Sequence, residues 1–279
     1  VDEIGEGVEG IEIGERVFIA PGLSCFACPD CLSGSDHLCQ SYQILGAGPD
    51  GGYAEYVKAP AKNIISIPET LSFEAAAAFP LTFLTAWHML VSRAALRPGQ
   101  DLLVLGGGSG VGSAAIQIGK LSGARVFATA GNTKKLEQAR LMGADFLIDH
   151  NQADFSKQIL ALTHGRGVDV VFEHVGPATF DKSLRALARS GTLVTCGATT
   201  GPSVELDLRY VFSRELTLMG AKMGRRAELI TVADLVGAGK LIPVIDSIFP
   251  LSAARAAQEK LLSRDLFGKI VLKPWGEGL

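Results

Sequence analysis

The sequence of 279 residues has no run of basic residues, and its formal net charge is -3. This charge balance argues against nucleic acid as a primary partner. The sequence also lacks an apolar segment long enough for a membrane span, because the longest one, residues 75–87, is broken by Pro80 and two threonines and falls short of roughly 18 residues. No secretory signal, internal repeat or low-complexity segment is visible. We expect a cytoplasmic protein that is not bound to a membrane and acts on a small-molecule substrate.

Cysteine is rare outside one short segment. Of five cysteines, four lie within fifteen positions, as Cys25-x2-Cys28-x2-Cys31-x7-Cys39. Such clustering indicates a metal site in a reducing compartment rather than a disulfide framework. The short spacers let successive thiolates converge on one ion, and four sulfurs around a structural zinc leave no position for water or substrate. His37 is a competing ligand that ranks below Cys39, and four free cysteines clustered by chance are the alternative.

Glycine is abundant, and its densest cluster lies between residues 106 and 112. The apolar run before the cluster predicts a buried strand, and the residues from Ser113 to Lys120 have helical spacing. A strand, a glycine turn and a helix in this order let backbone N–H groups approach a pyrophosphate, because no Cβ stands in the way. The match to the dinucleotide fingerprint is imperfect, since Ser109 occupies the place of the second glycine. The alternative is a glycine-rich connection without a ligand.

Strand and helix patterns alternate from residue 101 onward, which indicates an α/β fold with a doubly wound parallel sheet and helices on both faces. The expected strands are 101–105, 125–129, 168–172, 192–196 and 216–220, and the expected helices are 111–121, 133–142, 153–163, 178–189 and 225–239.

The first 66 residues are predicted to be largely β, with strand candidates in Val8–Ala20 and Tyr53–Lys58. From Ser72, a predicted N-cap, residues 73–91 are expected to be helical with a break or kink at Pro80. Near the end, we expect an extended run over 245–251, a helix over 252–263 and a strand over 268–273 that returns to the N-terminal β region.

Five features occur along the chain: Gly14-Glu-Arg-Val-Phe18, the four-cysteine lobe, Gly51-Gly-Tyr-Ala-Glu-Tyr56, the glycine turn and Phe267-Gly-Lys-Ile-Val-Leu272. Together they resemble the zinc-containing medium-chain dehydrogenase/reductase superfamily, which includes alcohol dehydrogenases and quinone oxidoreductases. The resemblance implies a partial GroES-like β domain with the zinc lobe over 1–90, completed by 245–279. It further implies a Rossmann dinucleotide-binding domain over 91–244, an active site in the cleft between the domains, and a homodimer or homotetramer.

Two departures from the family pattern bear on the chemistry. Family members usually carry a further segment before the point that matches Val1, with two ligands of a catalytic zinc, so we expect a fragment or a shortened member. Alcohol dehydrogenases also supply a cysteine ligand in the segment that matches Phe79–Thr85, where this chain has none. The fifth cysteine, Cys196, is interpreted as a small residue at the end of a sheet strand. The pattern is closer to quinone reductases, which work without a catalytic zinc.

The expected second strand favours NADP(H) over NAD(H). An acidic residue at its end would bind a ribose 2′-hydroxyl and repel a 2′-phosphate. The strand is instead followed by Ala130-Gly-Asn-Thr-Lys-Lys135, in which lysines and small polar groups suit a phosphate. In quinone-reductase relatives the positions that resemble Gly131, Lys135 and His150 lie around that phosphate. The alternative is that the lysines form the solvated first turn of a helix.

No acid–base pair is evident, so the catalytic residues are left unassigned. Thr82 and Tyr42 are candidates: Thr82 resembles a residue beside the nicotinamide, and Tyr42 either lines the substrate cleft or packs in the ordinary way. His174 follows a strand, where such sheets bind ligands. The residues expected to bind the cofactor are Thr85, Gly107, Ser109, Gly110, Val111, Gly131, Asn132, Lys135, His150, Val175, Gly197 and Ala198.

The leading hypothesis is an NADP(H)-dependent oxidoreductase that moves a hydride between nicotinamide and a carbonyl, an alcohol or an activated double bond such as that of a quinone or enal. One alternative is a zinc-dependent alcohol dehydrogenase whose catalytic site is incomplete in this chain. Another is a non-catalytic dinucleotide-binding protein.

Overall fold

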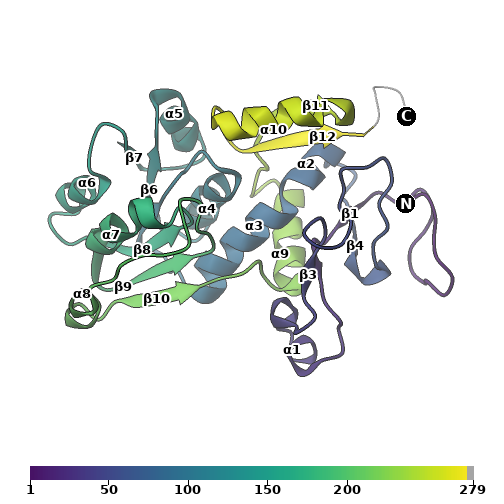
Figure 1. Ribbon diagram of the computed structural model, residues 1–279, viewed down its shortest axis with the longest axis horizontal. Helices are drawn as coiled ribbons and strands as arrows, with labels where there is room; N and C mark the ends of the chain where they lie inside the picture. Colours follow the sequence, from purple (N-terminus) through teal and green to yellow (C-terminus); the bar gives the residue numbers. More distant parts are fainter. Residues whose placement is uncertain (275–279) are drawn as a thin grey trace. The chain divides into compact units, whose positions relative to one another are not determined.

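The computed structural model describes residues 1–274, so the last five positions of the expected segment 245–279 lie outside the described residues. The chain forms two compact units (Figure 1). One is Thr85–Lys222, which contains the glycine turn. The other combines Val1–Leu84 with the chain from Met223 onward, and it contains the four clustered cysteines.

The unit Thr85–Lys222 is built on a parallel sheet of six strands. In chain order they are β5 (Asp101–Val104), β6 (Arg125–Ala130), β7 (Phe146–Asp149), β8 (Val168–Glu173), β9 (Leu187–Thr195) and β10 (Thr217–Gly220). Their order across the sheet is β10-β9-β8-β5-β6-β7. The chain therefore begins in the middle of the sheet, runs to one edge, crosses back and runs to the other edge. This is the Rossmann order, and it confirms the predicted doubly wound α/β fold.

One helix precedes the first of these strands, and the others connect the strands. They are η3 (His88–Arg93), a π-helix, and the α-helices α4 (Gly110–Leu121), α5 (Thr133–Leu141), α6 (Phe155–Leu162), α7 (Pro177–Ala186) and α8 (Leu208–Ser213). Short polar side chains begin several of them: Ser109, Asn132 and Asp154 each accept a hydrogen bond from a backbone N–H in the first turn that follows.

Strand β5 is buried on both faces, as expected for a parallel strand between two layers of helices. Leu102 points to α4, where Gly119 leaves so little room that a Cβ would lie 2.6 Å from the leucine side chain. Leu103 and Leu105 point to the opposite face and share a core with apolar side chains of α6 and α7. The alternation follows from the two-residue period of a strand.

The other unit is made of short strand pairs and helices. Strand β1 (Val17–Ile19) is antiparallel to β4 (Ile64–Ser66), β2 (Gly22–Leu23) is antiparallel to β3 (Gln43–Ile44), and β11 (Ile245–Pro250) is parallel to β12 (Lys269–Lys273). The helices are α1 (Pro29–Leu32), η1 (Asp36–Leu38), η2 (Ala61–Asn63), α2 (Phe73–Ala78), α3 (Pro80–Trp87), which runs into the first unit, α9 (Arg226–Gly237), η4 (Leu251–Ala253) and α10 (Ala254–Ser263).

Two polar contacts join distant segments of this unit. The buried Asn63 amide donates to the carbonyl oxygens of Ala20 and Gly22 at 2.8 and 2.6 Å. The Asp36 carboxylate accepts from the Arg226 N–H at 3.1 and 3.2 Å, where its negative charge complements the dipole of α9. Helix α9 therefore packs in this unit, whereas the range expected for the dinucleotide domain from the sequence runs to residue 244.

The predicted break in the helix after Ser72 is confirmed. The Ser72 hydroxyl oxygen accepts from the Ala75 N–H at 3.1 Å and caps α2, and α3 starts afresh at Pro80. Proline suits the first position of a helix because it lacks the N–H that would have no partner there.

Of two β predictions in the N-terminal region, one is wrong and the other is right only in part. Tyr53–Lys58 is not a strand, and within Val8–Ala20 only Val17–Ile19 is one. Tyr53 and Tyr56 are 67% and 65% exposed, so their apolar side chains lie on no core. Alternation of residue types makes a strand only where a partner strand and a core face are present.

The predictions around the sheet also need correction. The helix expected over 178–189 ends at Ala186, and β9 starts at Leu187 and is irregular at Ser190, whose φ is 58°. Strand β7 was not predicted, because four residues at a sheet edge give a weak pattern. The final strand, β12, pairs with β11 rather than with the N-terminal strands.

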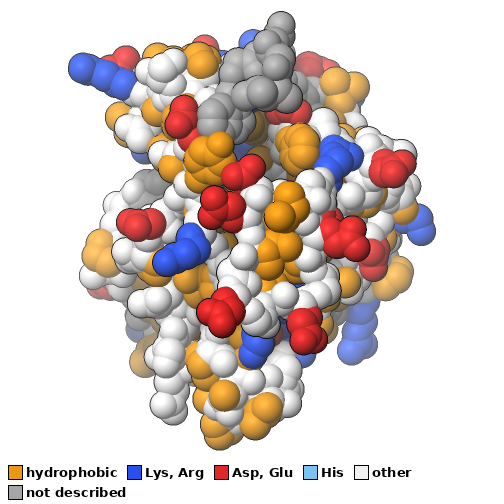
Figure 2. Space-filling model, turned by 90° about the vertical axis from the view of Figure 1, so that its right-hand side faces the viewer, with side chains coloured by type: hydrophobic (Ala, Val, Ile, Leu, Met, Phe, Trp, Pro, Cys, Tyr) orange, Lys and Arg blue, Asp and Glu red, His pale blue; other side chains and the backbone are white. Residues whose placement is uncertain are grey.

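Among residues 1–274, no helix combines the length and the apolar character that crossing a membrane would require. On the face drawn in Figure 2, acidic and basic side chains are interspersed, and the basic ones do not gather into a patch.

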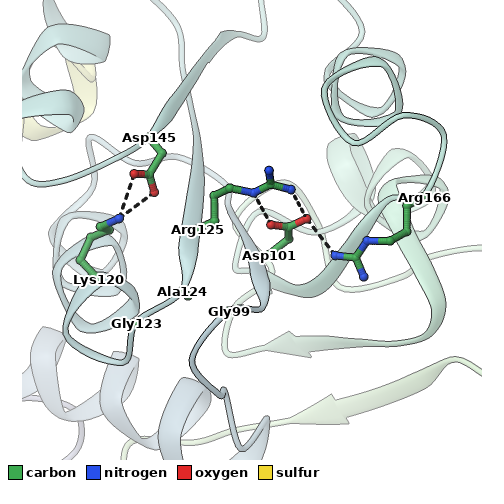
Figure 3. A pocket seen from close by; sticks show the side chains of 8 residues that line it. All are labelled: Gly99, Asp101, Lys120, Gly123, Ala124, Arg125, Asp145 and Arg166. Atoms are coloured by element: carbon green, nitrogen blue, oxygen red, sulfur yellow. Dashed lines mark hydrogen bonds and ion pairs between the residues drawn. The ribbon is translucent and has the colours of Figure 1, made fainter.

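The amino ends of three neighbouring strands carry an ion-pair network (Figure 3). Asp101, at the start of β5, is buried, and its two oxygens accept from Arg125, at the start of β6, at 2.6 and 2.7 Å. Arg166, just before β8, donates to the same carboxylate at 2.8 Å and to Asp169 at 2.7 Å. Asp101, Arg125 and Arg166 line a hollow of about 460 Å³ at the edge opposite the glycine turn. The network thus ties β6, β5 and β8 together where they begin.

We expect the Asp101→Asn variant to lose about 1–3 kcal/mol of unfolding free energy, because an amide cannot accept charge-assisted bonds from two guanidinium groups. The loss stays in this range because both arginines are half-exposed and remain hydrated. Urea denaturation measures it. Asp181→Asn, which removes an exposed pair with Arg185, is the control. A loss for Asp101→Asn no larger than that of the control would contradict the assignment.

Candidate functional site

The glycine turn connects β5 to α4 at the carboxyl edge of the sheet. Gly106 has a φ of 57°, which favours glycine, and a Cβ on Gly112 would lie 2.3 Å from the Gly106 carbonyl oxygen. The Ser109 hydroxyl oxygen accepts from the Gly112 N–H at 2.9 Å, so the serine in the second glycine position is the N-cap of α4. Helix geometry leaves the N–H groups of Gly110 and Val111 without intrahelical acceptors. With the helix dipole they form a site for an anion such as a pyrophosphate.

The loop after β8 is held by a wholly buried carboxylate. Glu173 accepts hydrogen bonds from the N–H groups of His174, Val175 and Gly176 at 3.0, 2.8 and 3.1 Å, and from the Thr179 hydroxyl at 3.0 Å. These four donors satisfy the charge and fix the start of α7. The sequence reasoning missed this residue. An acidic residue directly after the apolar run Val170–Phe172 was the signal that could have identified it.

The loop after β9 lies against the loop after β8. The N–H and the hydroxyl of Thr200 both donate to the Val175 carbonyl oxygen at 2.8 Å. A Cβ on Gly197 would lie 2.9 Å from the His174 carbonyl oxygen, and one on Gly176 would lie 3.3 Å from the Ala198 Cα. Three residues expected to bind the cofactor, Val175, Gly197 and Ala198, are therefore brought together at the carboxyl edge.

Another group of expected residues meets at the end of β6. A Cβ on Gly131 would lie 3.2 Å from the His150 Nε2 and 3.1 Å from the Asn151 Nδ2. The Asn132 side-chain oxygen accepts from the Lys135 N–H at 2.9 Å and starts α5. Burial is the main cause that lowers the pKa of His150; a nearby aspartate opposes the shift and Lys135 adds to it. The imidazole is therefore neutral at neutral pH and offers one N–H.

The carboxylates closest in sequence to this group have other partners. Asp149, which ends β7, accepts from the Asn151 N–H at 2.9 Å and from the Gln152 amide at 3.0 Å. Glu137 lies 3.7 Å from Arg140 in an exposed pair. Between Ala130 and Lys135 the sequence contains no carboxylate.

The catalytic candidates lie in α3 and in the zinc-lobe unit. Thr82 and Thr85 are buried and three residues apart, so they share one side of α3. The Thr82 hydroxyl donates to the Ala78 carbonyl oxygen at 3.2 Å. Tyr42 packs over Gly22, where a Cβ would lie 2.3 Å from the phenol oxygen. Burial, with a smaller contribution from a neighbouring aspartate, raises the pKa of Tyr42 to about 12, so the phenol keeps its proton.

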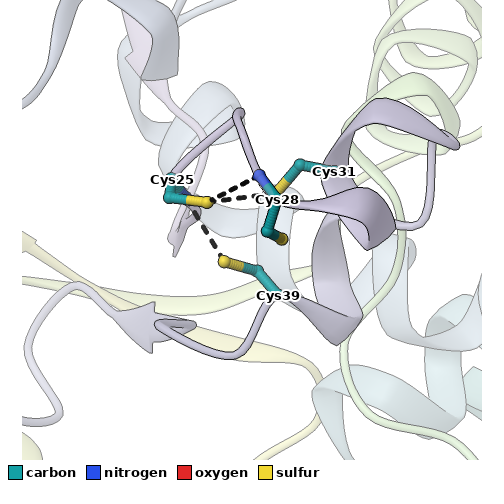
Figure 4. A group of neighbouring side chains, drawn as sticks. All are labelled: Cys25, Cys28, Cys31 and Cys39. Atoms are coloured by element: carbon teal, nitrogen blue, oxygen red, sulfur yellow. Dashed lines mark hydrogen bonds between the residues drawn. The ribbon is translucent and has the colours of Figure 1, made fainter.

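The four clustered cysteines converge on one point (Figure 4). Their sulfur atoms all lie within 4.8 Å of one another, and those of Cys25 and Cys31 are 3.8 Å apart. Zinc–sulfur bonds of about 2.3 Å in a tetrahedron give sulfur–sulfur edges of about 3.8 Å. Cys28 precedes α1 and Cys31 lies one turn into it, which brings these two thiols to one side. The arrangement fits a structural zinc ion. Within residues 1–274, the group suited to hold an ion consists of these cysteines and does not include His37.

Backbone N–H groups prepare this loop for a thiolate. The N–H groups of Ala27 and Cys28 donate to the Cys25 sulfur at 3.4 and 3.3 Å, and the Cys25 N–H donates to the Cys39 sulfur at 3.4 Å. The bonds from the Ala27 and Cys28 N–H groups are the main cause that lowers the pKa of Cys25 to about 6, whereas burial is the main cause that raises the pKa of Cys31 to about 12. Because zinc binds the thiolate form, such a loop favours the metal.

Comparison with known proteins agrees with this geometry. Residues 1–69 match the family profile "Alcohol dehydrogenase GroES-like domain", and residues 110–238 match "Zinc-binding dehydrogenase". The chain is 32% identical over 278 residues to an alcohol dehydrogenase of Geobacillus stearothermophilus, covering 98% of this chain and 80% of that protein.

Solved structures give the same result. One of an NAD-dependent alcohol dehydrogenase is 46% identical with a TM-score of 0.95, covering 98% of this chain and 80% of that one. One of a 2-octenoyl-CoA carboxylase reductase with NADP and 2-octenoyl-CoA is 28% identical with a TM-score of 0.91, covering 99% and 67%. The chain belongs to the medium-chain dehydrogenase/reductase superfamily, as its motifs indicate. It is an oxidoreductase whose coenzyme is a nicotinamide dinucleotide, NAD(H) or NADP(H).

We expect the purified protein to contain about one zinc ion per chain, since four thiolates form one closed tetrahedral site. Cys39→Ser removes the ligand that comes from the far side of the loop and should lower both the zinc content and the melting temperature. Elemental analysis and thermal melting measure these quantities before and after chelation. Cys196→Ser, outside the cluster, should leave the zinc content unchanged. A metal-free wild-type preparation with unchanged melting would rule the site out.

Proposed function

We propose that the protein is an NADP(H)-dependent oxidoreductase that transfers a hydride between nicotinamide and a carbonyl/alcohol pair or an activated C=C bond. The observation that carries the NADP(H) preference is the group at the end of β6, where Gly131 lies against His150, Asn132 starts α5, and Lys135 in the first turn of that helix is close enough to His150 to lower its pKa. In Rossmann proteins this is the position of the adenosine ribose, and a cation with neutral N–H donors there suits a 2′-phosphate.

The absence of a carboxylate directly after β6 supports the same preference. A protein that selects NAD presents an acidic side chain to the ribose hydroxyls. Here the strand is followed by Gly131 and Asn132, and Asp149 is engaged by the turn that follows β7. No carboxylate therefore follows β6 before Lys135, and Asp149 beside His150 is the negative charge that a 2′-phosphate would have to tolerate.

When bound, the nicotinamide coenzyme supplies the hydride chemistry, and the protein contributes position and electrostatics. The first turn of α4 offers the N–H groups of Gly110 and Val111 to the pyrophosphate. The loops after β8 and β9, tied together through Val175 and Thr200, line the carboxyl edge next to the turn. This is the part of a doubly wound sheet where the dinucleotide lies.

A second candidate is a zinc-dependent alcohol dehydrogenase whose catalytic site is incomplete in this chain. It is favoured by the names of relatives, since several at about 30% identity are called NAD-dependent alcohol dehydrogenase. Other relatives are named crotonyl-CoA carboxylase/reductase and crotonyl-CoA reductase, and these names indicate reduction of an activated double bond. The relatives thus divide between the two chemistries, and activity measurements must separate them.

Oxidation of NADPH and of NADH with a panel of quinones, enals and aldehydes tests the proposal, alongside reduction of NADP⁺ and NAD⁺ with alcohols. Turnover of quinones, enals or aldehydes with NADPH that persists after chelation of loosely held metal supports it. Alcohol oxidation that depends on added zinc would favour the second candidate. Saturable coenzyme binding without turnover of any of these substrates would contradict both and indicate a non-catalytic protein.

We expect Lys135→Ala to raise the KM for NADPH about tenfold and to leave the KM for NADH unchanged, because it removes one charge-assisted contact to a 2′-phosphate. Lys134→Ala is the matched control, since Lys134 is exposed at the start of the same helix. Steady-state kinetics with both coenzymes measures the effect. Equal changes for NADPH and NADH, or a tenfold preference of the wild type for NADH, would refute the assignment.

A further inference from the structure

The carbonyl group of Leu105 lies where the ladder between β5 and β8 ends. The last paired residues are Val104 and Phe172, and the Leu105 N–H still donates to the Phe172 carbonyl oxygen at 3.3 Å. After this point the two chains diverge, as they must at the switch point of a doubly wound sheet. The Leu105 carbonyl is therefore beyond the reach of the ladder, although the residue itself is buried. A buried carbonyl oxygen without a donor is costly.

The donor comes from a side chain, since the His174 Nε2 lies 2.9 Å from the Leu105 carbonyl oxygen. A carbonyl oxygen can only accept, so this bond assigns the proton to Nε2 and leaves Nδ1 without one in the neutral ring. Burial lowers the pKa of His174, which agrees with a neutral imidazole. The ring thus replaces the missing backbone donor at the switch point.

The same ring touches the glycine turn. A Cβ on Gly106 would lie 3.2 Å from the His174 Cε1, and the Ser109 hydroxyl oxygen lies 3.5 Å from Nε2. Gly106 is the residue with positive φ that turns the chain, and Ser109 caps α4. The imidazole therefore contacts the turn at three places: Leu105 before the bend, Gly106 at the bend and Ser109 after it.

We propose that His174 is a positioning residue for the coenzyme: by donating to the Leu105 carbonyl oxygen and packing on Gly106, it holds the glycine turn so that the N–H groups of Gly110 and Val111 face the pyrophosphate. The inference rests on the proposed function, because it requires a dinucleotide at this turn. His174 would raise the affinity for the coenzyme by holding the turn, and it would not contact the reacting atoms. Losing the bond frees the carbonyl to rotate, and the turn loses the geometry that preorganises its N–H groups.

The test compares His174→Leu, which keeps the volume but lacks a donor, with His174→Gln, whose amide can still donate to the carbonyl. His164→Leu, at an exposed position in the turn after α6, is the control. The affinities are measured by calorimetric titration with NADP⁺, 2′-phospho-ADP-ribose and 2′-AMP. The first two ligands contain the pyrophosphate and 2′-AMP lacks it, so the comparison isolates the contribution of the pyrophosphate to binding. If the wild type binds NAD⁺ instead, ADP-ribose and AMP replace the last two.

In the His174→Leu variant, the dissociation constants of NADP⁺ and 2′-phospho-ADP-ribose should rise about tenfold or more, the size expected for one lost buried hydrogen bond. The dissociation constant of 2′-AMP should stay within about twofold of the wild-type value. His174→Gln should recover most of the affinity, and kcat at saturating coenzyme should change little. Equal weakening of 2′-AMP would show a general loss of structure and overturn the inference, as would unchanged affinity for NADP⁺ or a glutamine variant as weak as the leucine variant.

A measurement on the wild type needs no substitution. Imidazole nitrogen NMR shifts should show His174 as the neutral tautomer with the proton on Nε2 at pH 7, and a charged ring or a proton on Nδ1 would overturn the inference. A wild type that binds neither NADP⁺ nor NAD⁺ refutes the proposed function itself. A wild type that binds, with a His174→Leu variant that binds equally well, refutes the role of His174 alone.

Discussion

The close contact between the two ends of the glycine turn is the constraint on which the dinucleotide unit depends. A Cβ on Gly112 would lie 2.3 Å from the Gly106 carbonyl oxygen, so α4 can start this close to β5 only with glycine at that position. Starting there, the helix directs its first N–H groups and its dipole to the carboxyl edge of the sheet. The loops after β8 and β9 end at the same edge, where Glu173 and Thr200 fix them. An anion-binding edge is therefore built from backbone, and side chains act chiefly by holding that backbone in place.

Where local chemistry determines the structure, the sequence predicts it well. Ser72 and Pro80 mark the start and the interruption of a helix whatever surrounds them, and both positions are as expected. The sulfur atoms of the four cysteines lie together because the short spacers between them keep these residues in one loop. Tertiary contacts decide the rest. Tyr53–Lys58 has the alternation of a strand but no core beneath it, and β7 is a strand because β6 offers it an edge.

The same division applies to the candidate site. The glycines, Asn132 and Lys135 could be recognised from their order along the chain, because turn and cap residues act at short range. The function of Glu173 could not, since its four donors become visible only when the loop is folded around it. His174 illustrates the limit more sharply: its partner, the Leu105 carbonyl, lies 69 residues earlier in the chain and needs a side-chain donor only because the sheet order changes there.

Similarity over nearly the whole chain establishes the family but not the coenzyme. The relatives include a solved NAD-dependent alcohol dehydrogenase and a reductase solved with NADP, both with TM-scores above 0.9. A fold shared this closely cannot distinguish the two coenzymes, because they differ by one phosphate at the end of β6. The decision therefore depends on the few side chains at that position. A carboxylate in place of Asn132 would repel a phosphate from the start of α5, whereas an amide there caps the helix and carries no charge.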